Sequence, residues 1–220
     1  NYFNVKHAIT VNSWTSGLVT AVGALEIEPG DEIIVPTWTM CATATAILHW
    51  NAIPVFADIE EDTFCISPDS IERNITPYTK AIISVDIGGH PANTEAINKI
   101  ADKHNLRVIS DTAQSPGSLN RGKFAGTLTD IGGYSLNYHK HIHTGEGGIL
   151  VTNDDDCQAS DEYLYKQNNI MRCSIAPPPG VDCKQYDAQA DWPNQVIYMN
   201  NLLNTLIDPK TCAPSLSPVW

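Results

Sequence analysis

The sequence is poor in basic residues and in long apolar runs. Only 13 of its 220 residues are Lys or Arg, against 25 Asp or Glu, which gives a formal net charge of −12. Because a nucleic-acid-binding protein needs a basic face, this balance argues against that class of function. No run of about 18 or more apolar residues occurs, so the sequence predicts no membrane-spanning helix and no membrane partner.

Motifs of several large enzyme classes are also missing. The six cysteines show no C-x-x-C pairing, which favours a reduced, cytoplasmic setting with buried or incidental thiols. No G-x-G-x-x-G follows a predicted strand and no G-x-S-x-G occurs, so a nicotinamide site and a serine-hydrolase elbow have no support. The start at Asn1 lacks both an initiator Met and the features of a signal peptide, so we expect a fragment.

Two further motifs are present but incomplete. Residues 117–124 approach a nucleotide-binding P-loop, but Phe124 stands where the Mg²⁺-binding Ser or Thr should be. His139, His141 and His143 alternate and could face one metal ion from an extended segment. No nearby cysteine or carboxylate pair completes that ligand set. A polar pocket wall is therefore the favoured interpretation, and no metal site is predicted.

Strand-like and helix-like segments alternate along the first two thirds of the chain, which predicts an α/β fold with a mostly parallel sheet flanked by helices. The predicted strands cover residues 8–11, 32–35, 53–57, 80–85, 106–110, 131–136 and 147–152. The predicted helices start near residues 18, 39, 67 and 92. Ligands of such sheets bind beyond the carboxyl ends of the strands, and Asp58, Asp86 and Asp111 lie at such ends.

The texture of the sequence changes past about Tyr165. Half of the 14 prolines and half of the six cysteines lie in residues 173–220, and the run Pro177-Pro178-Pro179-Gly180 interrupts any regular element. We therefore divide the chain into a folded domain, residues 1–156, and a divergent tail, residues 157–220. No packed second domain is predicted for the tail, with partial disorder as an open alternative.

Lys140, five residues after Ser135, is the main candidate for chemistry. A lysine in a partly desolvated pocket loses proton affinity and becomes a nucleophile that forms Schiff bases with carbonyls, including that of pyridoxal phosphate. This cofactor also needs a carboxylate for its pyridine nitrogen and anchors for its phosphate. Asp111 and the hydroxyl-rich helix start at residues 12–17 are suitable. On these residues alone, a surface lysine and a simple helix cap stay open.

The segment around Lys140 is one block of a longer ordered pattern, which runs from about Val11 to Asp154. This pattern resembles the DegT/DnrJ/StrS family of pyridoxal-phosphate-dependent sugar aminotransferases. The resemblance implies that residues 1–156 form the large domain of the type I aminotransferase fold, incomplete at its N-terminus, and that the small domain is not recognisable. The matching blocks are Pro29–Pro36, Pro54–Ile59, Ile75–Ile82, Asp111–Ser115 and Gly145–Gly148.

The resemblance also implies roles for single residues. Lys140 falls on the lysine that binds the cofactor covalently and shuttles a proton, and Asp111 falls on the carboxylate that pairs with the pyridine nitrogen. The other implied cofactor contacts are Thr15 and Ser16 at the phosphate-binding helix start, the phosphate-binding hydroxyl of Ser135, Gln114 near the cofactor O3′, and Met40, where the family has a stacking aromatic residue.

The activity implied by the resemblance is transfer of an amino group, usually from glutamate, to a keto group of a nucleotide-linked sugar. The pathway implied is amino-sugar or surface-polysaccharide biosynthesis, in a cytoplasmic homodimer with a shared active site. Two alternatives stay open. A sugar dehydratase is one, because some dehydrating relatives carry His in place of the lysine and His139 and His141 flank Lys140. A non-catalytic binding or regulatory module is the other, favoured by Met40 and the missing domain.

Overall fold

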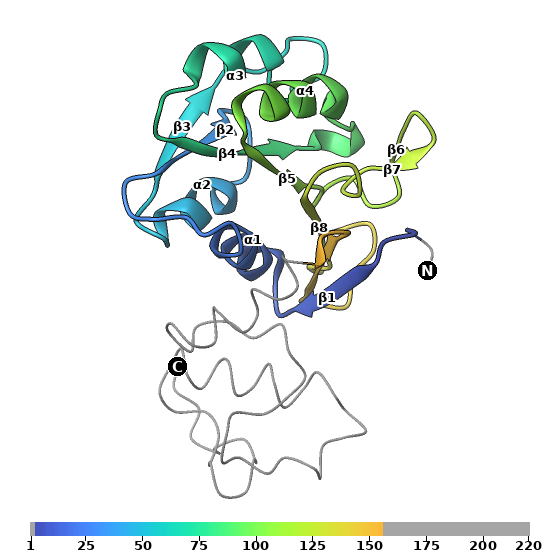
Figure 1. The fold of residues 1–220 in the computed structure, drawn as a ribbon. Coiled ribbons are helices and arrows are strands. Elements are labelled where there is room, and N and C mark those ends of the chain that lie inside the picture. Colours follow the sequence, from blue (N-terminus) through green and yellow to red (C-terminus); the bar gives the residue numbers. More distant parts are fainter. Residues whose placement is uncertain (1–2, 156–220) are drawn as a thin grey trace, which may run out of the picture. The chain divides into compact units, whose positions relative to one another are not determined.

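The structure, a computed structural model, describes residues 3–155. The predicted tail, residues 157–220, lies outside the described residues. The main element is a seven-stranded sheet in the order β1-β9-β8-β5-β4-β2-β3 (Figure 1). Its strands are β1 (His7–Val11), β2 (Glu32–Pro36), β3 (Ile53–Ala57), β4 (Thr79–Val85), β5 (Arg107–Asp111), β8 (Ile131–Ser135) and β9 (Gly148–Thr152).

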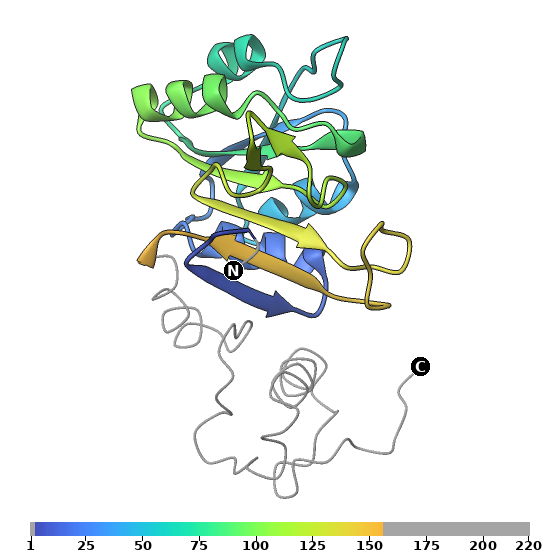
Figure 2. The same cartoon turned by 90° about the vertical axis from the view of Figure 1, so that its right-hand side faces the viewer.

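The predicted mostly parallel sheet is confirmed. Strands β3, β2, β4, β5 and β8 run parallel to their neighbours. Strand β9 returns antiparallel beside β8, and β1 pairs antiparallel with β9. The first strand of the described chain is therefore an edge strand that lies beside the last one (Figure 2). Because β8 and β9 are antiparallel neighbours, the loop that joins them lies at the carboxyl end of β8. This loop carries Lys140.

Two pairs of helices cover the sheet, with α1 and α2 on one side and α3 and α4 on the other (Figure 1). This cover is needed because successive strand residues such as Ile82 and Ile83 point to opposite faces and both are fully buried. The helices are α1 (Trp14–Gly23), α2 (Cys41–Leu48), α3 (Pro68–Asn74) and α4 (Thr94–His104), with a 3₁₀ turn, η1 (Ile87–Gly89), after β4.

Side-chain caps define where three of these helices begin. Ser13, Ser67 and Asn93 accept hydrogen bonds from the first-turn amides of α1, α3 and α4, as the small polar residues at these positions predict. Helix α2 begins at Cys41, later than expected, because Met40 is extended with φ −64° and ψ 138°. This conformation leaves Met40 on the loop between β2 and α2, at the rim of the site described below.

The face covered by α3 and α4 contains a buried apolar cluster. Its buried members are Ile34, Ala57, Cys65, Ile66, Ile71, Ile82, Ala92, Ile97, Ala101, Leu106 and Val108. The segment that approaches a P-loop instead forms a small hairpin of β6 (Leu119–Asn120) and β7 (Lys123–Phe124). Among residues 3–155, no helix has the length and apolar character needed to cross a membrane.

Candidate functional site

A cavity of about 460 Å³ lies at the carboxyl ends of β4, β5 and β8, where the starts of α1 and α2 also meet. This is the edge at which parallel sheets bind ligands. Six of the seven predicted site residues line it, namely Thr15, Met40, Asp111, Gln114, Ser135 and Lys140. Ser16, the seventh, is not among the lining residues.

Asp111 ends the central strand β5 at the floor of the cavity, and only 4% of its surface is exposed. Its Oδ1 accepts hydrogen bonds from Trp14 Nε1 at 2.7 Å and from Ala113 N at 3.3 Å. Its Oδ2 accepts a hydrogen bond from Thr43 Oγ1 at 2.9 Å. Thr43 is itself bonded to Thr39 at 2.8 Å. The carboxylate is therefore held by helices α1 and α2 as well as by its own strand.

Burial raises the pKa of the Asp111 carboxyl, because a charge at the cavity floor loses its water. Hydrogen bonds from Thr43, Trp14 and Ala113 oppose this effect on the pKa, as does the positive charge of Lys140. The ionised form of Asp111 thus depends on donors and on a nearby cation. Such a carboxylate is suited to pair with a protonated ring nitrogen.

Lys140 is carried by the loop that joins β8 to β9. Hydrogen bonds hold this loop together, from Lys140 N to Asn137 O at 2.9 Å and from Asn137 Nδ2 to Glu146 Oε1 at 2.7 Å. Within residues 3–155, no hydrogen bond or ion pair engages the Lys140 Nζ. An amine that lines a cavity without a protein partner is available for covalent chemistry.

The two predicted phosphate-binding residues at the start of α1 differ in their surroundings. Ser16 belongs to the cap, because its amide donates to Ser13 Oγ at 3.2 Å and its hydroxyl lies 3.0 Å from the same atom. Thr15 lines the cavity instead. Ser135, at the end of β8, is 7% exposed, and its hydroxyl accepts a hydrogen bond from Asn137 N at 3.3 Å. Thr15 and Ser135 therefore both lie at the cavity wall.

Gln114 and Met40 are far apart along the chain but line the same cavity. Gln114 Oε1 accepts a hydrogen bond from Gly88 N at 2.8 Å, which ties the loop after β5 to the turn η1 after β4. Met40 is 64% exposed, so it lies at the rim of the cavity rather than within its wall. Trp38 is not among the lining residues, and its ring faces Phe64 with centroids 6.4 Å apart.

Sequence reasoning missed Trp14 and Thr43, the two residues whose side chains donate hydrogen bonds to Asp111. The only signal for Trp14 was its bulk, which is unusual in a helix start built from small residues such as Ser13 and Thr15. Thr43 looked like an ordinary helical residue. His139 and His141 line the cavity. Among residues 3–155, no group of three or more His, Cys, Asp or Glu side chains is arranged to hold a metal ion.

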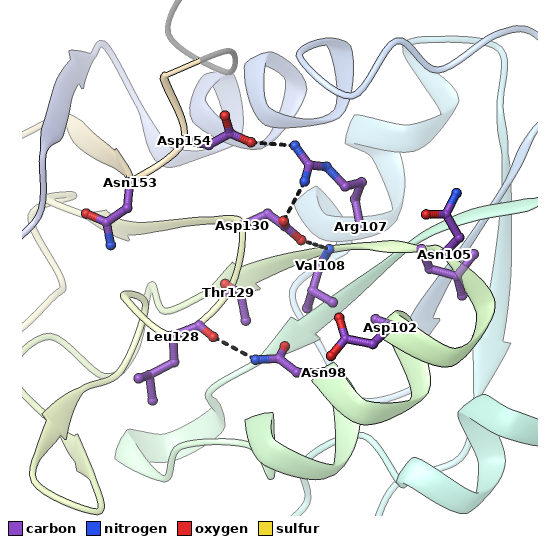
Figure 3. A pocket seen from close by; sticks show the side chains of 12 residues that line it. Asn98, Asp102, Asn105, Arg107, Val108, Leu128, Thr129, Asp130, Asn153 and Asp154 are labelled. Atoms are coloured by element: carbon purple, nitrogen blue, oxygen red, sulfur yellow. Dashed lines mark hydrogen bonds and ion pairs between the residues drawn. The ribbon is translucent and has the colours of Figure 1, made fainter.

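A second cavity, of about 580 Å³, lies at the opposite ends of the strands, beside the amino end of β5 (Figure 3). Arg107 donates from Nη1 to Asp130 at 2.8 Å and from Nη2 to Asp154 at 2.6 Å. Asp130 also accepts a hydrogen bond from Val108 N at 2.7 Å. Arg107 begins β5, Asp130 directly precedes β8, and Asp154 follows β9. We therefore interpret this cluster as a structural tie between the three strands.

Two relatives of this chain carry names that refer to nucleotide-linked sugars. The chain is 42% identical over 167 residues to GDP-perosamine synthase of Caulobacter vibrioides, covering 76% of this chain and 45% of that protein. It is 44% identical over 155 residues to UDP-N-acetyl-3-dehydro-alpha-D-glucosamine 3-aminotransferase of Acidithiobacillus ferrooxidans, covering 70% and 42%. The chain thus spans less than half the length of these relatives.

A solved structure extends the likeness to the fold. NtdA of Bacillus subtilis, solved with bound cofactor PMP, superposes with a TM-score of 0.68 at 34% identity, covering 74% of this chain and 37% of that one. The aminotransferase from Psychrobacter cryohalolentis superposes with a TM-score of 0.73 at 35% identity, covering 81% of this chain and 46% of that one. This confirms the predicted fold class, the type I aminotransferase large domain. The family model of the DegT/DnrJ/EryC1/StrS aminotransferases matches residues 1–171, most of the sequence. The chain belongs to the DegT/DnrJ/EryC1/StrS aminotransferase family.

Proposed function

We propose that the protein containing this chain uses pyridoxal phosphate to transfer an amino group to a keto group of a nucleotide-linked sugar. The observation that carries the proposal is one cavity that holds both the buried carboxylate of Asp111 and the Lys140 amine, which makes no hydrogen bond or ion pair with the described residues. The names of the relatives support a GDP- or UDP-linked sugar as the substrate class. An amino acid, glutamate in our proposal, is the donor.

The residues of the cavity fit this cofactor. Asp111 is a buried acceptor for a protonated ring nitrogen, and Lys140 is an amine for covalent attachment and for moving protons. Thr15, Ser135 and the amides at the start of α1 would hold the phosphate, because helix N-termini favour anions. Pyridoxal phosphate, when bound, supplies the electron sink that makes removal of a substrate proton feasible.

The remaining cofactor contacts are assigned by the same reasoning. Gln114 and Met40 line the cavity and would contact the ring and its O3′. Ser16 acts in this proposal through the cap, by fixing the start of α1 through Ser13 rather than by direct contact. We propose that residues 1–156 form the cofactor-binding domain and that residues 157–220 are a separate tail.

The quaternary and cellular setting are also part of the proposal. We propose a homodimer whose subunits share active sites, supported by the exposure of Met40 and Tyr138 around the cavity loops, at 64% and 70%. We propose a cytoplasmic location, supported by the free thiols of Cys41 and Cys65. Sedimentation analysis of the full chain would test the dimer: a single monomeric species at all concentrations would contradict it.

The first test is an absorbance spectrum of the full chain with added pyridoxal phosphate, followed by borohydride reduction and peptide mapping. We expect a visible band, with the reduced cofactor attached to the peptide that contains Lys140. The variant Lys140→Ala should lose the adduct, and the matched control Lys80→Ala, at an exposed position of β4, should keep it. A folded chain that forms no adduct, or an adduct elsewhere, would contradict the proposal.

Amino transfer itself is tested with ¹⁵N-glutamate and GDP- or UDP-linked keto-sugars, with the label followed into the sugar. A dehydratase is the second candidate, because His139 and His141 line the cavity beside Lys140 and could handle protons there. That reaction would release water from the sugar without transferring the label. Labelled amino-sugar supports the first function, and loss of a hydroxyl without label supports the second.

A further inference from the structure

Trp14, the first residue of α1, lies between the helix and the cavity floor. It is 4% exposed, lines the cavity, and donates from Nε1 to Asp111 Oδ1 at 2.7 Å. The two residues are 97 positions apart, so this bond joins the start of α1 to the end of β5. A buried donor that meets a buried carboxylate at this distance is a charge-assisted hydrogen bond, which is among the stronger ones in proteins.

Two glycines, Gly17 and Gly133, make the space that the Trp14 ring occupies, and a third, Gly148, lies against the Trp14 backbone. A Cβ at Gly133 of β8 would overlap Cζ3 and Cη2 of Trp14, and a Cβ at Gly17 would overlap Cε3. A Cβ at Gly148 of β9 would approach Trp14 N at 2.9 Å. The ring therefore packs directly against the backbone of the sheet. Because protein interiors are close-packed, this contact restrains the indole ring, whose N–H is directed toward Asp111.

A count of hydrogen bonds shows what this donor does to Asp111. An ionised carboxylate accepts about four hydrogen bonds, roughly two on each oxygen. Trp14 and Ala113 supply two to Oδ1, and Thr43 supplies one to Oδ2. Among residues 3–155, the one acceptor position that remains is on Oδ2. The protein thus leaves Asp111 a single place for an external donor.

We propose that Trp14 is a positioning residue for Asp111: its indole N–H saturates Oδ1 and fixes the carboxylate so that Oδ2 receives the pyridine N–H of the cofactor. This inference rests on the proposed function. Neighbouring ionisable groups also act on Asp111. Lys140 lies near enough to lower its pKa, the buried carboxylate Asp86 follows the adjacent strand, and His139, His141 and Glu146 line the same cavity.

The test uses the full chain with Trp14→Phe, which keeps most of the ring but removes the N–H. The matched control is Trp50→Phe, because Trp50 also donates from a partly buried indole, to Val19 O at 2.8 Å, but does not line the cavity. The first readout needs no cofactor. It is the titration of the Asp111 carboxyl by ¹³C NMR, with the signal assigned by its loss in Asp111→Asn.

Trp14→Phe should raise the pKa of Asp111 by about one unit, because one charge-assisted hydrogen bond to the ionised form is lost. Trp50→Phe should leave it unchanged. An unchanged Asp111 pKa in Trp14→Phe would overturn the inference and leave the indole a packing residue. In ¹⁵N-labelled pyridoxal phosphate bound to the chain, the pyridine nitrogen should titrate at a different pH in Trp14→Phe than in the control.

The same experiment separates the two proposals. If the unchanged chain binds no pyridoxal phosphate, the proposed function fails, and the assignment of Oδ2 to the pyridine N–H fails with it, whatever the carboxyl titration shows. If the chain binds the cofactor and the pyridine nitrogen titrates alike in Trp14→Phe and Trp50→Phe, the proposed function stands and the positioning role is refuted.

Discussion

The backbone N–H of Asp86 donates to the backbone oxygen of Asp111 at 3.0 Å, so two buried carboxylates end neighbouring strands beside each other. Asp86 accepts hydrogen bonds from Ala92 N and Thr112 Oγ1, at 2.8 and 2.7 Å. It therefore holds the loop after β4 against the loop after β5. The negative charge of Asp111 opposes ionisation of Asp86, because both carboxylates are buried on neighbouring strands.

The first prediction concerns the pH dependence of stability. Burial raises the pKa of Asp86 to about 6, with the charge of Asp111 acting in the same direction. The folded-state pKa lies above the unfolded one, so this group's contribution to stability is fully present below about pH 4 and is lost as the pH rises through about 6. A loss on the order of 3 kcal/mol follows from the size of that shift.

Urea unfolding of the cofactor-free chain between pH 4 and 7 measures this loss. Asp86→Asn keeps the shape and an acceptor for Ala92 N, and the loss should become smaller because the buried charge is gone. The control Asp62→Asn, at an exposed turn, should keep the pH dependence of the unchanged chain. Identical pH profiles for Asp86→Asn and the unchanged chain would contradict the prediction.

The second prediction concerns the packing of Trp14 against β8. Gly133→Ala should destabilise the fold by about 3 kcal/mol or more, because the added methyl would overlap the indole ring and a packed core resists overpacking. In a Trp14→Ala background the same substitution should cost less but still destabilise the fold, because the added Cβ would lie 2.5 Å from the backbone oxygen of Ile149. Free energies of unfolding for the two single variants and the double variant provide the measurement. Additive costs would show that the ring is not what excludes a side chain at Gly133.

Much of this fold follows from local sequence. All seven strands of the main sheet were predicted, several of them from runs rich in Ile and Val such as residues 80–85, because burial on both faces demands apolar residues at consecutive positions. Because ligands of parallel sheets bind beyond the carboxyl ends of the strands, the order of elements also placed Asp111 and the loop of Lys140 at the same end of the sheet. These inferences need only the period of the pattern and the order of the elements.

The details of the site could not be predicted in this way. The contact between Trp14 and Asp111 depends on how closely α1 approaches β8, and Gly133 determines that distance through the absence of a side chain. The exposure of Met40 depends on α2 starting at Cys41, so that Met40 stays on the preceding loop. No capping side chain in the sequence indicates this start. Such features are set by tertiary packing, and local propensity carries no information about them.

The third prediction concerns the ion-pair cluster of Figure 3. Arg107→Met should reduce stability by about 1 kcal/mol, because two carboxylates lose a partner but the side chain is 45% exposed and partly screened. Cofactor binding should not change, since the cluster lies at the opposite ends of the strands. The control Lys99→Met breaks a more exposed pair with Glu95 and should cost less. Thermal unfolding and a cofactor titration test both parts, and weaker cofactor binding in Arg107→Met would contradict the second.

The fourth prediction concerns Met40 at the rim of the cavity. Met40→Phe should tighten the binding of pyridoxal phosphate about two- to twelvefold, because a flat ring beside the cofactor adds stacking worth about 0.5–1.5 kcal/mol. Leu48→Phe, at the other end of α2, adds the same ring at an exposed site that does not line the cavity, and it should leave the dissociation constant unchanged. Fluorescence titration of the full chain measures both. Equal dissociation constants for Met40→Phe and the unchanged chain would show that position 40 does not contact the cofactor, and the stacking surface would then have to come from another wall of the cavity.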